Sequence, residues 1–369
     1  MEINISQLVR SVWLQTINIK RKISMKMKHK LTRPFFIMAA TTAIIIPTAS
    51  QAGELTISGQ VNRMVASVDN GVNSELQHLD NSGSGTRFRL KGETDTGNGL
   101  KVGFYWETQY QSNKSSAADA TSVTDFNDET QTRHRDLYIK GEFGKVSLGQ
   151  GDGAANGITE TEFTGTTYLT GYASPEDIWG GVTFGKTTTK VGAVIDGMDA
   201  LSRNDRLRYD SPKLGPVSIS LDTGQGGKTE AAVRFETAIG GGKLKGGVGT
   251  WDQNDAGTGK GTSGSIAYLD ESGLNGAVSF GNLDAVGGLP DPSNTMVALG
   301  YKTGPHSVSL RLGTTDDKTP GVSADSTEIG YVNRSLKSAE LYAAYQVFEV
   351  DIAGSEDIGI VFAGARVKF

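Results

Sequence analysis

Apolar and polar side chains alternate along most of the chain from Gly53 onward. In residues 86–91, for example, Phe88 and Leu90 fall on one side and three basic side chains fall on the other. The same alternation recurs in residues 101–107, 206–210, 217–222 and 308–312. Because successive side chains of a β-strand point to opposite faces, each segment has one apolar and one polar face. The pattern predicts an all-β fold.

The alternating segments and the turn residues between them predict sixteen strands. The predicted strands cover residues 55–66, 86–94, 100–111, 132–142, 144–150, 206–211, 216–223, 229–237, 243–252, 262–270, 274–282, 294–302, 306–315, 325–334, 338–349 and 357–369. Short turns alternate with mostly longer connections, which are residues 67–85, 112–131, 151–205, 253–261, 283–293, 316–324 and 350–356. An even number of strands, with short turns at one rim and long loops at the other, is typical of a transmembrane barrel.

Alternation alone fits two architectures, a soluble β-sandwich and a membrane β-barrel. The polar faces carry five arginines at positions 87, 89, 135, 206 and 208. A water-filled lumen solvates such charges, whereas the dry core of a sandwich has to pair each one. The sequence therefore predicts a 16-stranded antiparallel transmembrane β-barrel, with Phe88, Phe104 and Leu310 facing outward.

A basic segment and an apolar run precede the alternating region. Residues 26–33 are rich in Lys and Arg, and an apolar run of about twelve residues follows and ends shortly before Ala52. This pattern predicts a signal peptide at 25–52 that is cleaved after Ala52, and a probable non-native upstream extension at 1–24. The alternative is a membrane anchor, but the run is shorter than the roughly 20 residues that span a bilayer.

Composition narrows the function classes. The chain has 369 residues, 49 Gly and no Cys, which excludes disulfides, thiolate metal sites and a cysteine nucleophile. Residues 53–369 hold 28 Lys and Arg against 40 Asp and Glu, a formal charge of −12. An acidic body argues against nucleic-acid binding, which needs a basic face. No motif for a cofactor is found.

Four motifs in order resemble the general porins of the Gram-negative outer membrane, across essentially all of residues 53–369. The motifs are RFRLKGET with GNGL at 87–100, GEFGKVSLGQ at 141–150, RYDSP at 208–212 and the final Phe369. The resemblance implies passive diffusion of small hydrophilic solutes and ions through a homotrimer in outer-membrane lipid and lipopolysaccharide. It also implies that the barrel-assembly machinery reads Phe369, and that the third loop, 151–205, folds inward and narrows the pore.

In this family, arginines of the barrel wall face carboxylates of the inward loop. Matching the motifs assigns the basic wall to Arg87, Arg135 and Arg206 or Arg208, and parity adds Arg89. The candidate carboxylates in the loop are Asp152, Glu160, Glu162, Glu176 and Asp177. Opposed charges would set up a transverse field; alternatively, the arginines only anchor the loop. The segment before Lys140 is two residues shorter than the family pattern, so this strand is expected to be shortened or bulged.

Other functions remain open at this point. An outer-membrane enzyme would need a nucleophile with a base, and the mature chain offers only His78, His134 and His306. Of these only His134, near Asp136, has a carboxylate on the same strand face. A substrate-specific channel would use a line of aromatic side chains along the pore, whereas Tyr105 stands alone on the polar face. An adhesin or structural barrel would have a plugged lumen.

Overall fold

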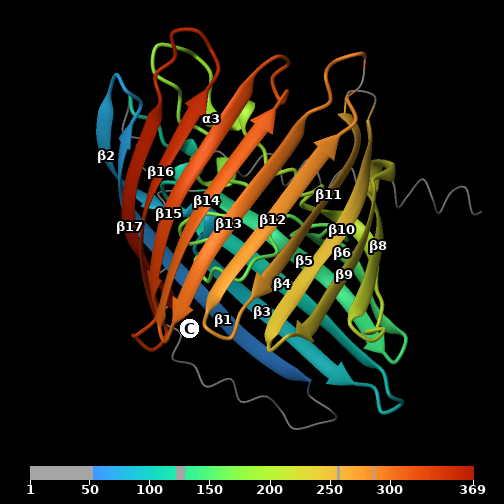
Figure 1. Cartoon of the computed structure of the whole chain (residues 1–369). Helices are drawn as coiled ribbons and strands as arrows, with labels where there is room; N and C mark the ends of the chain where they lie inside the picture. The colour runs from blue at the N-terminus through green and yellow to red at the C-terminus, as the bar shows by residue number, and fades with distance from the viewer. Residues whose placement is uncertain (1–52, 122–128, 256–257, 286) are drawn as a thin grey trace, which may run out of the picture. The chain divides into compact units, whose positions relative to one another are not determined.

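The computed structural model describes residues 53–121, 129–255, 258–285 and 287–369. The predicted extension at 1–24, the signal peptide at 25–52 and its cleavage after Ala52 lie outside these residues, and they stay predictions. The described residues form one antiparallel sheet that closes on itself (Figure 1). Within this part of the chain, no helix has the length and apolar character needed to cross a bilayer.

Seventeen strand segments occur in the described ranges. They are β1 (Glu54–Asp69), β2 (Ser74–Asp80), β3 (Arg87–Asp95), β4 (Lys101–Gln111), β5 (Glu129–Gly141), β6 (Gly144–Asp152), β7 (Arg203–Asp210), β8 (Val217–Gly224), β9 (Thr229–Ile239), β10 (Gly242–Asp255), β11 (Thr258–Leu269), β12 (Leu274–Leu283), β13 (Ser293–Thr303), β14 (His306–Asp316), β15 (Ser323–Asn333), β16 (Ala339–Val350) and β17 (Ile358–Lys368). The short helices are η1 (Ser82–Ser84), η2 (Ser115–Ala117), α2 (Glu176–Trp179), α3 (Val191–Val194) and η3 (Gln225–Gly227).

The strands occupy sixteen positions in the barrel. Each strand from β3 to β17 pairs antiparallel with the next, and β17 pairs with β1 from Gln60↔Lys368 to Asp69↔Gly359. The remaining edge of β1 is shared, because β2 pairs with its second half and β3 with its first half. Since β2 and β3 together fill one position, the predicted 16-stranded barrel is confirmed.

The prediction of a long loop at 67–85 is wrong. A four-residue turn joins β1 to β2, with the Asn70 N–H donating to the Asn73 carbonyl at 3.0 Å. The break between β2 and β3 falls on a run of Asn, Ser and Gly. These residues favour turns because their side chains bond nearby backbone groups. Here the Asn81 side chain accepts from the Gly83 N–H and caps η1.

The two rims of the barrel differ in the length of their connections, although less strictly than predicted. At one rim the connections have two to six residues, at 96–100, 142–143, 211–216, 240–241, 270–273, 304–305 and 334–338. At the other rim lie 112–128, 153–202, 284–292, 317–322 and 351–357. The connections at 70–73, 225–228 and 256–257 on this rim are short. The predicted strands 216–223 and 229–237 already left few residues at 225–228. The other two connections are short because the extra strand β2 follows β1 and because β10 and β11 extend further than the alternation indicates.

The apolar faces of the strands point away from the barrel interior, as predicted. Leu137, Leu148 and Phe88 are 64%, 61% and 39% exposed. On the opposite face, Asp136, Arg311 and Gln346 are buried. A belt of exposed apolar side chains around a closed sheet fits hydrocarbon outside and polar groups inside.

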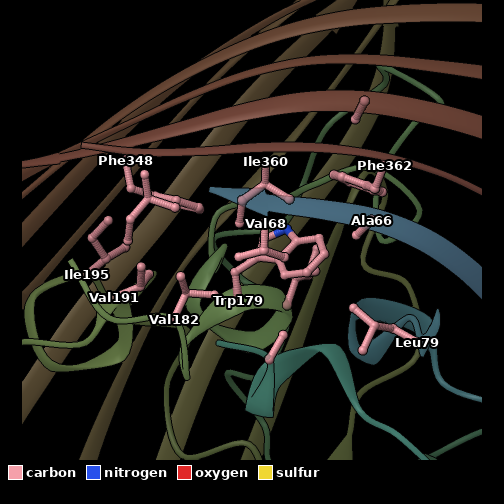
Figure 2. Packing of buried hydrophobic residues seen from close by; sticks show 14 of the residues in the cluster. Ala66, Val68, Leu79, Trp179, Val182, Val191, Ile195, Phe348, Ile360 and Phe362 are labelled. Carbon is pink, nitrogen blue, oxygen red and sulfur yellow. The ribbon is translucent and has the colours of Figure 1, made fainter. Parts of the chain in front are cut away.

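The segment between β6 and β7, residues 153–202, has a hydrophobic cluster of its own. Trp179, Val182 and Ile195 pack against Phe348 and Phe362 of the closing strands (Figure 2). The rings of Trp179 and Phe362 meet edge to face at 5.2 Å between centroids. All of these side chains are nearly inaccessible to solvent, so one side of the segment is fixed by packing rather than by polar contacts alone.

Candidate functional site

A polar cavity of about 760 Å³ lies between the strands and the 153–202 segment. Strands β3, β4 and β5 contribute Arg87, Gln109 and Arg133. The other parts of the cavity are lined by residues of the segment, by Arg203 at the start of β7, by Asp152 and by residues at η1 and η2. Charged side chains of both signs therefore face one volume.

The basic side of the cavity is held by hydrogen bonds between neighbouring strands. The Arg87 Nε donates to Gln109 Oε1 at 3.0 Å, and the Arg133 Nε lies 2.7 Å from Glu107 Oε1. Glu107 also pairs with Arg89, which lies next to the cavity rather than on its lining. One buried carboxylate thus orients two guanidinium groups, and a third, that of Arg87, lies 3.9 Å from it.

Arg135 does not lie in this cluster, contrary to the prediction from the motif. A bulge in β5 places Glu107 opposite His134 and Thr108 opposite Thr132, so Arg133 is the extra residue. The bulge confirms the expected irregularity before Lys140 and shifts side-chain parity in this strand. Arg135 lies two residues before Leu137 and is exposed on the same face, while the bulge turns Arg133 toward the cavity in its place.

The acidic side of the cavity comes from the 153–202 segment. Glu160 accepts from the Tyr168 hydroxyl at 2.6 Å. Asp199 accepts from the backbone N–H of Thr159 at 3.0 Å and from its hydroxyl at 2.9 Å. Burial raises the pKa of Asp199 to about 6 although these bonds oppose the shift. Burial, and then repulsion from Asp199, raise the pKa of Glu160 well above its ordinary value.

Two further predicted carboxylates lie on the same cavity. Glu176 accepts from the Gly197 N–H at 3.0 Å, and Asp177 accepts from the Tyr172 hydroxyl at 2.8 Å. Burial raises the pKa of both groups, and for Glu176 the nearby Asp196 adds to the shift. The segment therefore presents a cluster of carboxylates whose pKa values are all raised by burial.

Glu162 has a different position from the other predicted carboxylates. It lies on the far wall, where Arg311 Nη2 is 2.5 Å from its Oε1 and Arg311 Nη1 is 2.7 Å from Glu328 Oε2. The hydroxyls of Thr164 and Thr166 accept from the same guanidinium at 2.8 and 2.9 Å. Glu162 is not on the lining of the 760 Å³ cavity. It ties the segment to β14 and β15.

The two ends of the 153–202 segment are held to the sheet by Arg206, Arg208 and Asp152. Arg206 Nη2 lies 2.9 Å from Asp136 Oδ2, and Arg208 Nη2 lies 2.7 Å from Asp210 Oδ1. Both arginines also donate to the backbone carbonyl of Asp152, while the Asp152 side chain pairs with Arg203 at 2.9 Å. These contacts fit the anchoring alternative, since the guanidinium groups satisfy carbonyls where the chain leaves the sheet.

The functional residues that the sequence prediction missed have two origins. Arg133 was hidden by the bulge, although the short spacing before Lys140 indicated an irregularity. Arg203, Asp196 and Asp199 lie in or next to a connection that has no periodic pattern. Among the described residues, no group of three or more His, Asp and Glu side chains is arranged to hold a metal ion.

The last residue, Phe369, extends the pairing between β17 and β1 that closes the barrel. The backbone of Phe369 pairs with Gly59 in both directions, at 2.9 and 3.1 Å, and its ring is 64% exposed on the outer face. A methyl group on Gly59 would come within 2.4 Å of that ring. The glycine therefore provides the space in which the aromatic ring lies.

A Gram-negative porin family model matches residues 39–353. The chain belongs to the Gram-negative porin family. No curated protein sequence matches it. The porin barrel is similar to the anion-selective porin from Comamonas acidovorans (18% identity, TM-score 0.59, covering 86% of this chain and 100% of that one). Salmonella typhi OmpF in complex with daunomycin gives 14% identity and a TM-score of 0.58, covering 86% of this chain and 98% of that one.

The outer membrane channel DcaP of Acinetobacter baumannii has 16% identity and a TM-score of 0.58, with 86% of this chain and 98% of that one covered. At such identities these likenesses show the fold alone. Together with the family match, the closed barrel makes this porin an outer-membrane protein that forms a channel for passive diffusion. This family and fold point to a channel rather than to an enzyme.

Proposed function

We propose that residues 153–202 fold inward and form the narrow part of the channel, where small hydrophilic solutes and ions pass between opposed charges. The observation that carries this proposal is the lining of the 760 Å³ cavity. Arg87, Arg133 and Arg203 contribute to it from the wall, and Glu160 and Asp199 contribute from the segment.

The opposed charges act on solutes through a field across the channel. A passing water molecule or polar solute aligns with the field, whereas an apolar solute gives up polar contacts and gains none. Ions are selected by whichever charge is in excess at the narrowest point. The Arg311–Glu162 and Trp179–Phe362 contacts hold the segment at two places, which supports a fixed constriction rather than a mobile one.

The alternatives have weaker support. In an outer-membrane enzyme, the candidate general base would be His134, because the carboxylate of Asp152 lies 3.6 Å from it. Its ring also lies 4.7 Å from the ring of Tyr105. These two neighbours of His134, Asp152 and Tyr105, offer no serine or threonine hydroxyl as a nucleophile. A structural barrel with a plugged lumen does not need a cavity lined by charges of both signs.

Assembly and targeting follow the same proposal. The porin is directed to the periplasm by residues 25–52, is cleaved after Ala52 and is inserted as a homotrimer among outer-membrane lipid and lipopolysaccharide. The exposed ring of Phe369 is accessible to the barrel-assembly machinery before the seam closes. Vibrio cholerae OmpT, a structural neighbour at 14% identity, has been observed in a trimer form.

Reconstitution in a planar lipid bilayer tests the channel. Each insertion of the purified protein should raise the membrane conductance in a step that divides into three equal levels. The current–voltage relation of each level should be linear at low voltage. The Arg87→Gln and Asp199→Asn variants should shift the reversal potential in a KCl gradient in opposite directions. If both variants keep the wild-type reversal potential, these residues do not line the constriction.

A further inference from the structure

A second cavity, of about 420 Å³, lies on the same strands nearer the short-turn rim. Strand β3 supplies Arg87 to the first cavity and Lys91 to the second, and β5 supplies Arg133 to the first and Lys140 to the second. Strands β3, β4, β5 and β6 are successive neighbours in the sheet (Figure 1). The two cavities therefore follow one another along the wall.

Most charges around the second cavity are already paired. Asp136 and Asp210 pair with Arg206 and Arg208, at 2.9 and 2.7 Å. At the short-turn end, Lys140 lies 2.6 Å from Glu93. The last carboxylate on the lining, Asp152, is directed toward Arg203 at 2.9 Å and toward His134 at 3.6 Å. Each nearby carboxylate thus has a cationic partner of its own.

Two ammonium groups on the lining of the second cavity have no carboxylate partner. Within the described ranges, neither Lys91 nor Lys145 makes a hydrogen bond or an ion pair, and both line the second cavity. Lys145 Nζ lies 4.8 Å from the centre of the Tyr138 ring. That contact orients a cation without neutralising it, because a ring quadrupole carries no net charge. The cavity thus holds about two uncompensated positive charges.

A buried hydroxyl adds an unpaired donor. Ser147 is 1% exposed, lines the second cavity, and its Oγ has no hydrogen-bond partner in the described part of the chain. A buried polar group without a partner is unusual and points to a ligand or ordered solvent. Ser147 pairs in register with Tyr138 on one side and with Arg208 on the other. It therefore lies beside the Lys145–Tyr138 contact.

The absence of a side chain at Gly103 leaves space for the ring of Tyr138. Gly103 is opposite Tyr138 in register, and a methyl group there would come within 2.4 Å of the ring. The hydroxyl end of the ring consequently lies next to Gly103. Its hydroxyl donates to Glu93 Oε2 at 2.8 Å, which fixes the ring at its far end. The surface beneath Lys145 is thus preorganised before any ligand enters.

We propose that Lys91, Lys145 and Ser147 form a binding subsite for a small oxyanion of the phosphate type, next to the constriction on the short-turn side. This inference rests on the proposed function as a diffusion channel and deepens it. Lys145 and Ser147 lie two residues apart on one face of β6 and can donate to oxygens of one anion, and Lys91 on β3 adds a second positive charge to the same cavity. A phosphate passing the constriction would pause here, whereas chloride uses fewer donors.

The test measures block and binding separately. Purified protein in a planar bilayer, at constant chloride, is titrated with sodium phosphate, and phosphate binding to the same protein in detergent is measured by calorimetry. Phosphate should lower the chloride conductance to a plateau. The Lys145→Gln variant should raise the half-blocking and half-binding concentrations about tenfold, and Lys91→Gln and Ser147→Ala should each raise them about threefold.

Lys243→Gln is the matched control. Lys243 also lies near the short-turn end, on β10, but not on the lining of the second cavity. It should keep the wild-type block if the subsite is specific. A block that is equally weakened by Lys243→Gln and Lys145→Gln would reduce the effect to net charge and overturn the subsite. Chloride conductance without any saturable phosphate binding would also overturn it while leaving the channel intact. Phosphate binding without conductance would instead overturn the channel.

Discussion

The guanidinium of Arg311 in β14 donates to both carboxylate oxygens of Glu162, 149 positions earlier in the chain, at 2.5 and 3.1 Å. Arg311 is 3% exposed, and Glu328 accepts from its remaining side. A charge this deeply buried is tolerated only because its donors are satisfied by carboxylates and hydroxyls. The contact fixes the middle of the 153–202 segment to the far wall of the barrel.

Removing this guanidinium should loosen the segment. Arg311→Met leaves Glu162 and Glu328 buried without a cation, which costs about 3–5 kcal/mol. We expect faster proteolysis within 153–202 and a larger, noisier single-channel conductance, with the barrel itself retained. The control is Lys260→Gln, whose partner Asp252 forms an exposed pair, and it should change neither measurement. Wild-type protease resistance in Arg311→Met would contradict the anchoring role.

The bulge in β5 places Arg133 and Arg135 on opposite faces of one strand, so variants of these two residues can be compared directly. Arg133→Gln should raise the ratio of cation to anion permeability about twofold, because a positive charge leaves the cavity wall. Arg135→Gln removes the same charge from the same strand, but from the outer face. It should leave the reversal potential in a KCl gradient unchanged. The opposite result, with Arg135 sensitive and Arg133 silent, would mean that the register of β5 is wrong.

The acidic segment predicts a pH-dependent selectivity. The pKa of Asp199 is raised to about 6, and that of Glu160 lies well above its ordinary value. As the pH falls from 8 to 5, Asp199 gains a proton and loses its negative charge, so cation permeability should decrease. Reversal potentials measured over this range test the sign. In Asp199→Asn the selectivity at pH 8 should already be shifted toward anions, and the pH dependence should be smaller.

The same pKa shifts affect stability. A carboxyl whose pKa is higher in the folded than in the unfolded state binds more protons when folded. Its contribution is therefore present below a pH of about 4 and is lost as the pH rises through about 6. The segment should resist protease better at pH 5 than at pH 8, and Asp199→Asn should reduce that difference. Equal cleavage rates at both pH values in the wild type would contradict this linkage.

Packing of the segment gives the fifth prediction. Trp179→Ala removes a fully buried side chain that contacts Phe362, and such truncations cost about 3–5 kcal/mol. We expect the near-ultraviolet circular dichroism of the segment to weaken and its cleavage by protease to accelerate. Phe280→Ala is the comparison, because Phe280 is 43% exposed on the outer face and does not contact the segment. It should leave the cleavage rate within 153–202 unchanged.

Most of the barrel could be predicted from the sequence because strand structure is a local property. Side chains alternate with period two, and Gly, Asn, Asp and Pro mark the turns. Each of the sixteen predicted strands has a counterpart in the structure, usually with ends within a few residues. The extra strand β2 was missed because it is short, and Asn, Ser and Gly follow it directly.

The assignment of faces followed from the same local pattern. Arg87 lies at the cavity, and Phe88 next to it lies on the outer face, as alternation requires. The assignment failed for Arg135, which shares its strand face with Leu137 and was placed on the polar face by the motif match and not by alternation. Alternation also did not reveal the extra residue that turns Arg133 toward the cavity.

The sequence by itself determined an all-β chain with one apolar and one polar face, since both follow from neighbours a few residues apart. Only the tertiary structure decided which charges meet. Glu160 and Asp177 line the cavity with Arg87, whereas Glu162 is bound to Arg311 on the far wall. These side chains come from a segment without periodicity, and its path depends on contacts with residues more than a hundred positions away. Local pattern carries no information on such distances, because they are set by the closure of the barrel and by packing inside it.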